Sequence, residues 1–463
     1  MTSSPPAQHL PEPPAAPEPA APRSVEVSHR RVLAIALPMT VAHLTTPLLG
    51  VVDTAVVGRL GDPALMGGVA LGAVIFDFLF WGFGFLRMGT VGLAAQALGQ
   101  GDAQETRAVA ARALLLALAC GLALVVLQWP IGLGARALAG ASPAVDAAVG
   151  AYFHIRIWAA PFSLANYAVV GWLTGIGRTG HALAIQVGIS LVNMAATVAL
   201  VLGLGWGVAG SAAGTLLAEA LGAGVGVLVC ARLLKFRLAV PRAVLFDRSR
   251  LMATFVLNRD IMIRTAALLV GFSFFAAQGA RAGDVVLAAN ALLNNMILLA
   301  AYFLDGFATA AEQICGQAVG ARNRAAFGRA MRLVLLWGFG FALCACALYL
   351  AAGPAIVDLM TTSDAVRTAA RDFLIFAAVL PVVGAAAYAF DGIYIGALWS
   401  RDMRNLMLLS LALYLGSFAV LRPLGNEGLW LAFLVFLGAR GALQALRLPA
   451  LMNRTFPRTA NGR

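Results

Sequence analysis

Charged residues are scarce in this chain. Of its 463 residues only 12% are Asp, Glu, Lys or Arg, whereas 61% are apolar, and the mean hydropathy is +0.85. A soluble domain carries about 25% charged residues, so the composition excludes a soluble enzyme of two or three domains. Because a membrane-spanning helix needs about 20 apolar residues, the length accommodates about a dozen spans with short connectors. We therefore expect a polytopic, all-α membrane protein.

Motifs for catalysis, metal binding and disulfide formation are also lacking. The five cysteines fall in or beside apolar segments without a CxxC pair or a Cys/His cluster, so we expect no disulfide framework, metal site or cofactor. An intramembrane enzyme is disfavoured because there is no HExxH, no GxSxG and no plausible Ser/His pair in the predicted spans. The net charge of +12 comes without a basic stripe interleaved with aromatics, so nucleic acid is not an expected partner.

The basic residues that are present alternate between connectors. Arg and the single Lys cluster near residues 30–31, 107–112, 232–250, 322–332, 401–404 and 447–463. The connectors between these clusters hold far fewer basic residues. By the positive-inside rule, this alternation predicts an even number of spans, with both termini on the cytoplasmic side of the cell membrane.

Apolar runs between these connectors predict twelve helices in two lobes. The first lobe, residues 30–233, has candidates at 32–57, 65–97, 106–132, 144–173, 181–203 and 207–233. The second lobe, residues 251–452, has candidates at 251–278, 285–317, 327–352, 364–395, 403–421 and 427–452. We expect a basic cytoplasmic linker at 234–250, a disordered Pro/Ala-rich cytoplasmic tail at 1–29 and a cytoplasmic tail at 453–463.

The two predicted lobes repeat each other. The segment Gln96-Ala97-Leu98-Gly99 recurs as Gln317-Ala318-Val319-Gly320 at a shift of 221, and Gly175 recurs as Gly396 at the same shift. Since each copy contains an even number of spans, the copies share one orientation and are related by a pseudo-twofold axis along the membrane normal. Two such bundles facing a cleft are typical of an alternating-access carrier; a duplicated scaffold without transport is the alternative.

Intramembrane polar residues are the candidates for function, because each costs energy in lipid. In the first span Asp53, Thr46 and Met39 are spaced by seven residues and share one helical face. A carboxylate in a low-dielectric cavity has a raised proton affinity, so Asp53 could exchange a proton for a cation; the alternative is capping or pairing with Arg59. Asn193 and Thr197 share one face of the fifth span.

Thr215 of the sixth span could meet Asn193 and Thr197, to line a polar cavity or to make interhelical hydrogen bonds. In the second lobe, Asp305, Glu312 and Asp391 could attract a cationic ligand, or pair with a buried Arg such as Arg264 or Arg440. For Arg87 and Glu219 we favour structural pairing, and for His43 a packed, hydrogen-bonded role.

Several strings resemble the multidrug and toxic compound extrusion (MATE) family, in particular its DinF-like branch. They are PLLGVVDTAVVG at 47–58, FGFLRM at 83–88, GLAAQA at 92–97, LDGFA at 304–308, DGIYIG at 391–396 and RDMRN at 401–405. The resemblance runs from about residue 30 to 450. It implies a twelve-helix, two-lobe antiporter, with a monomeric transport unit, that expels amphipathic, often cationic small molecules in exchange for H⁺ or Na⁺.

The resemblance also assigns expected roles to single residues. Asp53 matches the first-helix Asp used in the family's coupling models, and Asn193 and Thr215 match polar residues of the same cavity. Thr197 stands where the similar transporters usually carry a second Asp, which weakens a Na⁺ site because a hard cation needs several oxygen ligands and charge balance. We therefore expect H⁺ coupling through Asp53; the alternatives are Na⁺ coupling and flipping of a lipid-linked precursor.

Overall fold

The computed structural model describes residues 24–237 and 240–457, except for the side chains of residues 46–49, 51 and 138. The side chain of Thr46 therefore lies outside the described residues, as do residues 1–23 and 458–463 of the two predicted tails. Throughout the described ranges the regular structure is helical, without strands.

The first half of the chain folds into one helical bundle. Its elements are α1 (His29–Gly58), α2 (Pro63–Trp81), α3 (Phe85–Gln100), α4 (Ala103–Val126), α5 (Gln128–Ala139), α6 (Pro143–Arg156), the 3₁₀ turn η1 (Ile157–Ala159), α7 (Ala160–Gly175), α8 (Thr179–Val198), the π-turn η2 (Ala199–Gly203) and α9 (Gly207–Leu233). The short helix α10 (Arg242–Leu245) lies in the predicted linker.

The second half folds into a bundle of longer, mostly uninterrupted helices. Its elements are α11 (Arg248–Arg281), α12 (Asp284–Gly320), α13 (Arg324–Met360), α14 (Asp364–Gly396), α15 (Ser400–Leu421), the 3₁₀ turn η3 (Arg422–Leu424) and α16 (Gly425–Thr455). The last helix extends three residues beyond the boundary predicted at 452.

The twelve predicted spans are confirmed as helical segments, but three of them are interrupted. The span predicted at 65–97 breaks between α2 and α3, where Gly82 and Gly84 flank a turn. The span predicted at 144–173 breaks at η1, just before α7 begins with Ala160 and Pro161, because proline lacks the backbone N–H that would continue the helix. The span predicted at 106–132 ends as α4, and α5 follows after Leu127.

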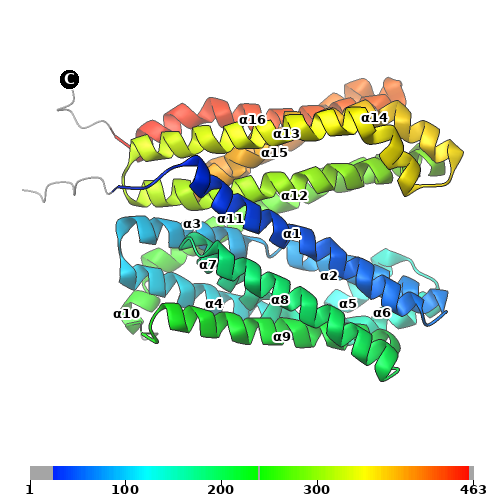
Figure 1. Ribbon diagram of the computed structural model, residues 1–463, viewed down its shortest axis with the longest axis horizontal. Coiled ribbons are helices and arrows are strands. Elements are labelled where there is room, and N and C mark those ends of the chain that lie inside the picture. Colours follow the sequence, from blue (N-terminus) through cyan, green and yellow to red (C-terminus); the bar gives the residue numbers. More distant parts are fainter. Residues whose placement is uncertain (1–23, 238–239, 458–463) are drawn as a thin grey trace, which may run out of the picture.

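Length and hydropathy identify nine stretches that could cross a membrane within the described residues, and one of these, Ser400–Thr455, contains both α15 and α16. Figure 1 shows the two bundles as separate layers, with α11–α16 in one and α2–α9 in the other. Helix α1 runs diagonally between them and contacts both α12 and α8. The described chain begins and ends at the same end of the molecule, here called the termini end.

The two copies of the repeated motif meet at the termini end. A Cβ atom on Gly99 would overlap the backbone carbonyl of Gln317, and a Cβ on Gly320 would overlap the carbonyl of Gln96. The contact is reciprocal, because Gly320 is the equivalent of Gly99 and Gln317 the equivalent of Gln96 at the shift of 221. The pseudo-twofold axis therefore passes through this contact. We call the contact between residues 96–99 and 317–320 the seal.

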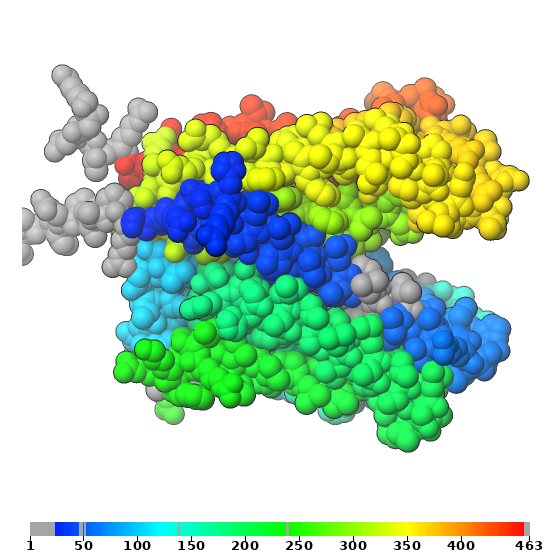
Figure 2. Space-filling view, viewed as in Figure 1, coloured from blue at the N-terminus to red at the C-terminus, as the bar shows by residue number. Residues whose placement is uncertain are grey.

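A hydrogen bond and an ion pair reinforce closure around the seal. The Gln96 side-chain amide donates to the carbonyl of Gly396 at 2.9 Å. Glu105 of α4 pairs with Arg112 at 2.6 Å and, across the two lobes, with Arg250 of α11. Figure 2 shows the lobes in contact at this end and separated at the opposite end. The cleft therefore opens away from the termini.

Candidate functional site

Asp53 occupies a buried position near the end of α1. Its side chain is 8% exposed, and its Oδ1 atom has no hydrogen-bond partner. The hydroxyl of Thr197 lies beside the carboxylate, and the guanidinium of Arg156 lies within electrostatic range. The approach of Thr197 falls short of hydrogen-bond geometry, since its Oγ1 atom is also without a partner. Oδ1 of Asp53 and Oγ1 of Thr197 are therefore both buried without a hydrogen-bond partner.

The polar face of α8 is shaped by a local irregularity. The α-helix gives way to the π-turn at Ala199–Gly203 two residues after Thr197, and π-turns occur frequently at functional sites. Helix α9 packs closely here, because a Cβ on Gly214 would lie 3.0 Å from the Thr197 hydroxyl. Asn193, one turn earlier on the same face, is 1% exposed with an unpartnered Oδ1.

Thr215 and Met39 are engaged elsewhere. The Thr215 hydroxyl donates to the Ser211 carbonyl of its own helix at 3.1 Å. Met39 is 1% exposed, and its sulfur accepts a long 3.9 Å contact from the Thr174 hydroxyl of α7. Fourteen residues of helix separate Met39 from Asp53, or about 21 Å at 1.5 Å per residue. The spacing therefore keeps Met39 out of the Asp53 pocket, and the hydroxyl of Thr215 is bonded within its own helix.

Arg156 is a member of this pocket that our sequence analysis did not select. It ends α6 immediately before η1, is 8% exposed, and leaves its Nη1 atom without a partner. Its guanidinium lies 5.4 Å from the Phe76 ring centroid and 5.2 Å from that of Phe80, within cation–π range. The available signal was an Arg inside a predicted span, the criterion that selected Asp53.

The cleft between the lobes carries further polar groups. Asp77 of α2 is exposed and interacts electrostatically with Arg156 on its own side of the cleft. Tyr302 of α12 interacts electrostatically with Asp77 and with Asp305. Acidic and hydroxyl groups from both lobes therefore face the same space.

In the second lobe, Asp391 is saturated with partners. Its Oδ2 atom accepts from Arg264 of α11 and from Arg440 of α16, the latter at 2.6 Å, while Oδ1 accepts from the Gln444 amide at 2.8 Å. Asp391 is 4% exposed. Of the two roles considered from the sequence, the structure shows ion pairing, and with both candidate arginines at once.

Asp305 and Glu312 are placed differently from Asp391. Asp305 is half-buried, whereas Glu312 is 2% exposed and its Oε2 atom has no partner. Both interact electrostatically with Arg87 of α3, across the boundary between the lobes. The predicted structural pairing of Arg87 is incomplete, since its Nη1 is buried without a partner.

Glu219 accepts a hydrogen bond from the Asn166 amide at 2.7 Å. The buried Nε2 atom of His43 lacks a partner.

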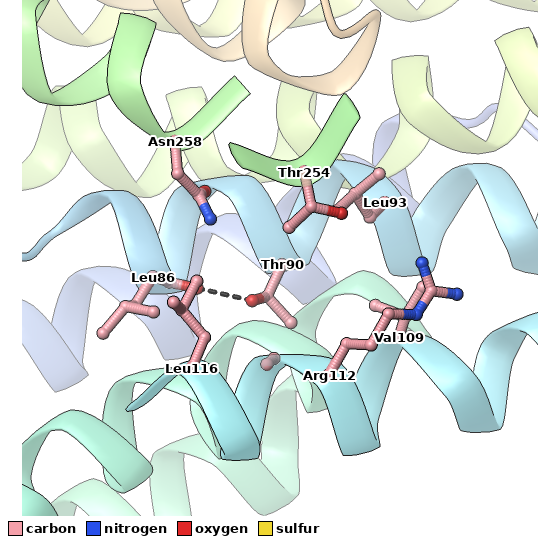
Figure 3. A pocket seen from close by; sticks show the side chains of 9 residues that line it. Leu86, Thr90, Leu93, Val109, Arg112, Leu116, Thr254 and Asn258 are labelled. Carbon is pink, nitrogen blue, oxygen red and sulfur yellow. Dashed lines mark hydrogen bonds between the residues drawn. The ribbon is translucent and has the colours of Figure 1, made fainter. Parts of the chain in front are cut away.

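A small pocket lies elsewhere, between the lobes and near the seal. Leu86 and Thr90 of α3, Val109, Arg112 and Leu116 of α4, and Thr254 and Asn258 of α11 line it (Figure 3). None of the predicted site residues is among its lining residues, so this pocket belongs to the closed interface. Among the described residues, three His, Cys, Asp or Glu side chains nowhere gather as a metal site would require.

Comparison with known proteins places this geometry in a family. The sequence profile of the MatE family matches residues 38–199 and 261–417, more than half of the chain. The chain is 38% identical to the DNA damage-inducible protein F of Escherichia coli (strain K12), over 91% of both proteins. It is 27% identical to a probable multidrug resistance protein NorM of Rhizobium meliloti (strain 1021), over 92% of this chain and 94% of that protein.

Solved structures share the fold. A crystal structure of MATE in the bent conformation superposes with a TM-score of 0.84 at 19% identity, covering 92% of this chain and 96% of that one. The outward-facing conformation of a multidrug resistance MATE family transporter superposes with a TM-score of 0.79 at 19% identity, covering 91% and 96%. Similarity at this identity establishes the two-lobe fold, and the profile and relatives establish the family. The chain therefore belongs to the MatE family, the multidrug and toxic compound extrusion proteins, which are membrane transporters and not enzymes.

Proposed function

We propose that this transporter is a H⁺-coupled efflux antiporter of the cell membrane, exporting amphipathic, often cationic compounds as Asp53 takes up a proton. The names of several relatives mark them as probable multidrug resistance proteins, which supports the substrate class. The observation that carries the coupling role is the state of Asp53, which is buried beside Arg156 with an unpartnered carboxylate oxygen.

The orientation follows from the distribution of basic residues. Arg clusters lie in the connectors near the termini end, including residues 232–250 and 322–332, and the positive-inside rule assigns such connectors to the cytoplasm. On this assignment both termini are cytoplasmic, and the cleft in Figure 2 opens to the outside. Asp53 then receives its proton from the external side.

The coupling rests on competition between a proton and a cationic substrate for one ionised site. An unpaired buried carboxylate costs several kcal/mol, so Asp53 is stabilised by a proton, by Arg156 or by a bound cation. A cationic substrate binds the ionised state, and protonation removes that attraction. Because the two ligands exclude each other, the inward proton gradient drives outward release of the substrate.

Na⁺ coupling is the second candidate. Three oxygens in this pocket lack hydrogen-bond partners: Asp53 Oδ1, Asn193 Oδ1 and Thr197 Oγ1, and oxygen is the ligand type that hard cations prefer. Two features favour H⁺ instead. Arg156 already supplies a positive charge to the pocket, and Thr197 offers a neutral oxygen where a carboxylate would balance a metal charge.

The test uses purified protein in liposomes, with a pH gradient and a Na⁺ gradient imposed separately and ethidium as a fluorescent cationic substrate. We expect the pH gradient alone to drive ethidium movement in the wild type, and Asp53→Asn to lose it while remaining folded. Glu219→Gln is the matched control, since it neutralises a half-buried acid of the same lobe.

Each result bears on the assignment. Exchange retained in Asp53→Asn would refute the coupling role of Asp53. Flux that requires Na⁺ would replace H⁺ with Na⁺ as the coupling ion. Absence of flux under either gradient, in folded protein, would contradict cationic-drug antiport and favour movement of a lipid-linked precursor.

A further inference from the structure

Glu312 is a buried acid that the proposed coupling at Asp53 does not use. Its side chain is 2% exposed, and its Oε2 atom has no hydrogen-bond partner. The other deeply buried acid of the second lobe, Asp391, receives three hydrogen bonds from two arginines and a glutamine. Of these two deeply buried acids, Glu312 is therefore the one without a bonded partner.

The backbone holds Glu312 where the second lobe meets the first. A Cβ on Gly396 of α14 would lie 2.5 Å from the Glu312 carbonyl oxygen, so α12 and α14 touch backbone to backbone here. One turn further along α12, a Cβ on Gly316 would lie 2.9 Å from the Cβ of Ala95 of α3. The seal begins at the next residue, so Glu312 lies directly on the cleft side of the seal.

Charged and titratable groups from several helices surround Glu312. Arg264 of α11 is already bonded to Asp391. Arg87 retains a buried Nη1 without a partner and belongs to the opposite lobe. Among the described residues, the groups that interact electrostatically with Glu312 are Arg87 of α3, Arg264 of α11, Asp391 of α14 and Asp305 of α12 itself. His43 of α1 interacts in turn with Arg87.

The charge state of Glu312 is consequently tied to the position of the lobes. With the seal closed, an ionised Glu312 is buried without a bonded partner, which costs several kcal/mol, and a proton removes that cost. When the lobes separate at the seal, water reaches the carboxyl group and the ionised form is solvated. Two conformations that differ in proton affinity at one site couple proton binding to the conformational change.

We propose that Glu312 is a second proton-carrying residue of the transport cycle. It holds a proton while the seal is closed and releases it to water at the termini end when the lobes separate there. The proton passes from the carboxyl oxygen to water, and the carboxylate left behind is hydrated or paired with Arg87. This inference rests on the proposed antiport and adds one proton per cycle to the proton carried by Asp53.

The first test needs no substrate. Infrared spectra of the protein in lipid, recorded over a pH series, resolve the C=O stretch of protonated carboxyl groups. We expect Glu312→Gln to lose one such band relative to wild type. Glu219→Gln, whose acid accepts a hydrogen bond from Asn166, should keep every pH-dependent carboxyl band that the wild type shows with the seal closed. Identical wild-type and Glu312→Gln spectra would overturn the proposal.

The second test measures stoichiometry. Liposomes clamped at zero membrane potential are given a pH gradient. We then determine the ratio of ethidium concentrations on the two sides of the membrane at which net flux stops. Removing one of two coupled protons lowers that limiting ratio about tenfold for each unit of pH gradient. A tenfold lower ratio in Glu312→Gln with retained flux supports the proposal, and an unchanged ratio contradicts it.

Further variants keep the inference falsifiable. If Glu312→Gln does not fold, Glu312→Asp retains the acid and must retain a carboxyl band, shifted in frequency, and its absence would count against the proposal. If ethidium is not transported, the infrared result still decides whether Glu312 carries a proton, so failure of the antiport proposal and failure of this one are distinguishable.

Discussion

The two lobes share an architecture but differ in how their helices and charges are built. In the first lobe three spans are interrupted, two of them at the turn after Trp81 and at η1 (Ile157–Ala159). Their counterparts α12 and α14 are continuous through the equivalent positions. Gly84, at the first break, corresponds to Asp305 at the shift of 221. The duplicated scaffold therefore retained its packing while its local geometry diverged.

The buried charges of the two lobes also differ. Asp391 in the second lobe has both carboxylate oxygens bonded, whereas Asp53 and Arg156 in the first lobe each leave a buried polar atom unpartnered. A buried polar atom without a partner is held at an energetic cost. Asp391 is therefore stabilised by its partners, whereas Asp53 in the first lobe and Glu312 in the second each carry that cost.

The largest expected effect comes from removing the charge of Asp391, which two arginines share. Asp391→Asn leaves Arg264 and Arg440 buried without a counter-charge, and removal of one partner from a buried ion pair costs about 3–5 kcal/mol. We expect a marked loss of thermal stability in detergent. Asp372→Asn, the same change at an exposed site on the same helix, serves as control. Equal stability of both variants would show that the network does not stabilise the second lobe.

Next in size is the effect of obstructing the seal. Gly99→Ala places a Cβ against the Gln317 carbonyl, and Gly320→Ala places one against that of Gln96. Overpacking costs about 1–3 kcal/mol, or about 5- to 150-fold in the population of the closed form. By the pseudo-twofold relation we expect similar losses of flux in both variants. Gly328→Ala, with nothing within 4 Å, should transport normally.

Substitution of Arg156 tests the pocket around Asp53. We expect Arg156→Gln to reduce pH-driven ethidium flux about tenfold, equivalent to about 1.4 kcal/mol, because Asp53 then loses its nearby positive charge. Arg156→Lys keeps the charge and should restore most of the flux. Thermal stability measured alongside separates this role from packing against Phe76 and Phe80. Equal loss of flux in both variants would assign Arg156 to packing.

The smallest effect is expected at the helix break of the first lobe. Replacing both Gly82 and Gly84 with Ala favours a continuous helix, at about 0.5–1 kcal/mol per residue. We expect slightly higher thermal stability and flux reduced about twofold, because the lobe becomes as regular as its partner. Gly416→Ala on α15 should give a similar gain in stability without a change in flux. Unaltered flux in the double variant would show that the break does not serve motion.

Much of the architecture was predictable from local sequence. The twelve spans follow from apolar runs, and the repeat follows from matches such as Gln96 with Gln317. The break at Gly82–Gly84 was missed because the flanking residues are as apolar as the helices themselves. The break at η1 carried a visible signal in Pro161, but a proline inside a spanning segment is also compatible with a kinked, continuous helix.

The partners of the buried charges were not predictable in the same way. Asp391 and Arg264 are 127 residues apart, and Asp391 and Arg440 are 49 apart. No periodicity within a single helix relates positions on different helices, so the sequence left pairing and ligand attraction as equal alternatives. The packing of α11, α14 and α16 decides between them.

The sequence by itself determined that this protein lies in a membrane, that it is built from two copies of a six-span unit, and that a few acids remain at membrane depth. These features depend on composition and on spacing along one chain. Only the tertiary structure decided that Asp391 is neutralised by two arginines while Asp53 and Glu312 are not. The physical reason is that the energy of a buried charge depends on the groups that surround it in space, and those groups come from helices far apart in the sequence.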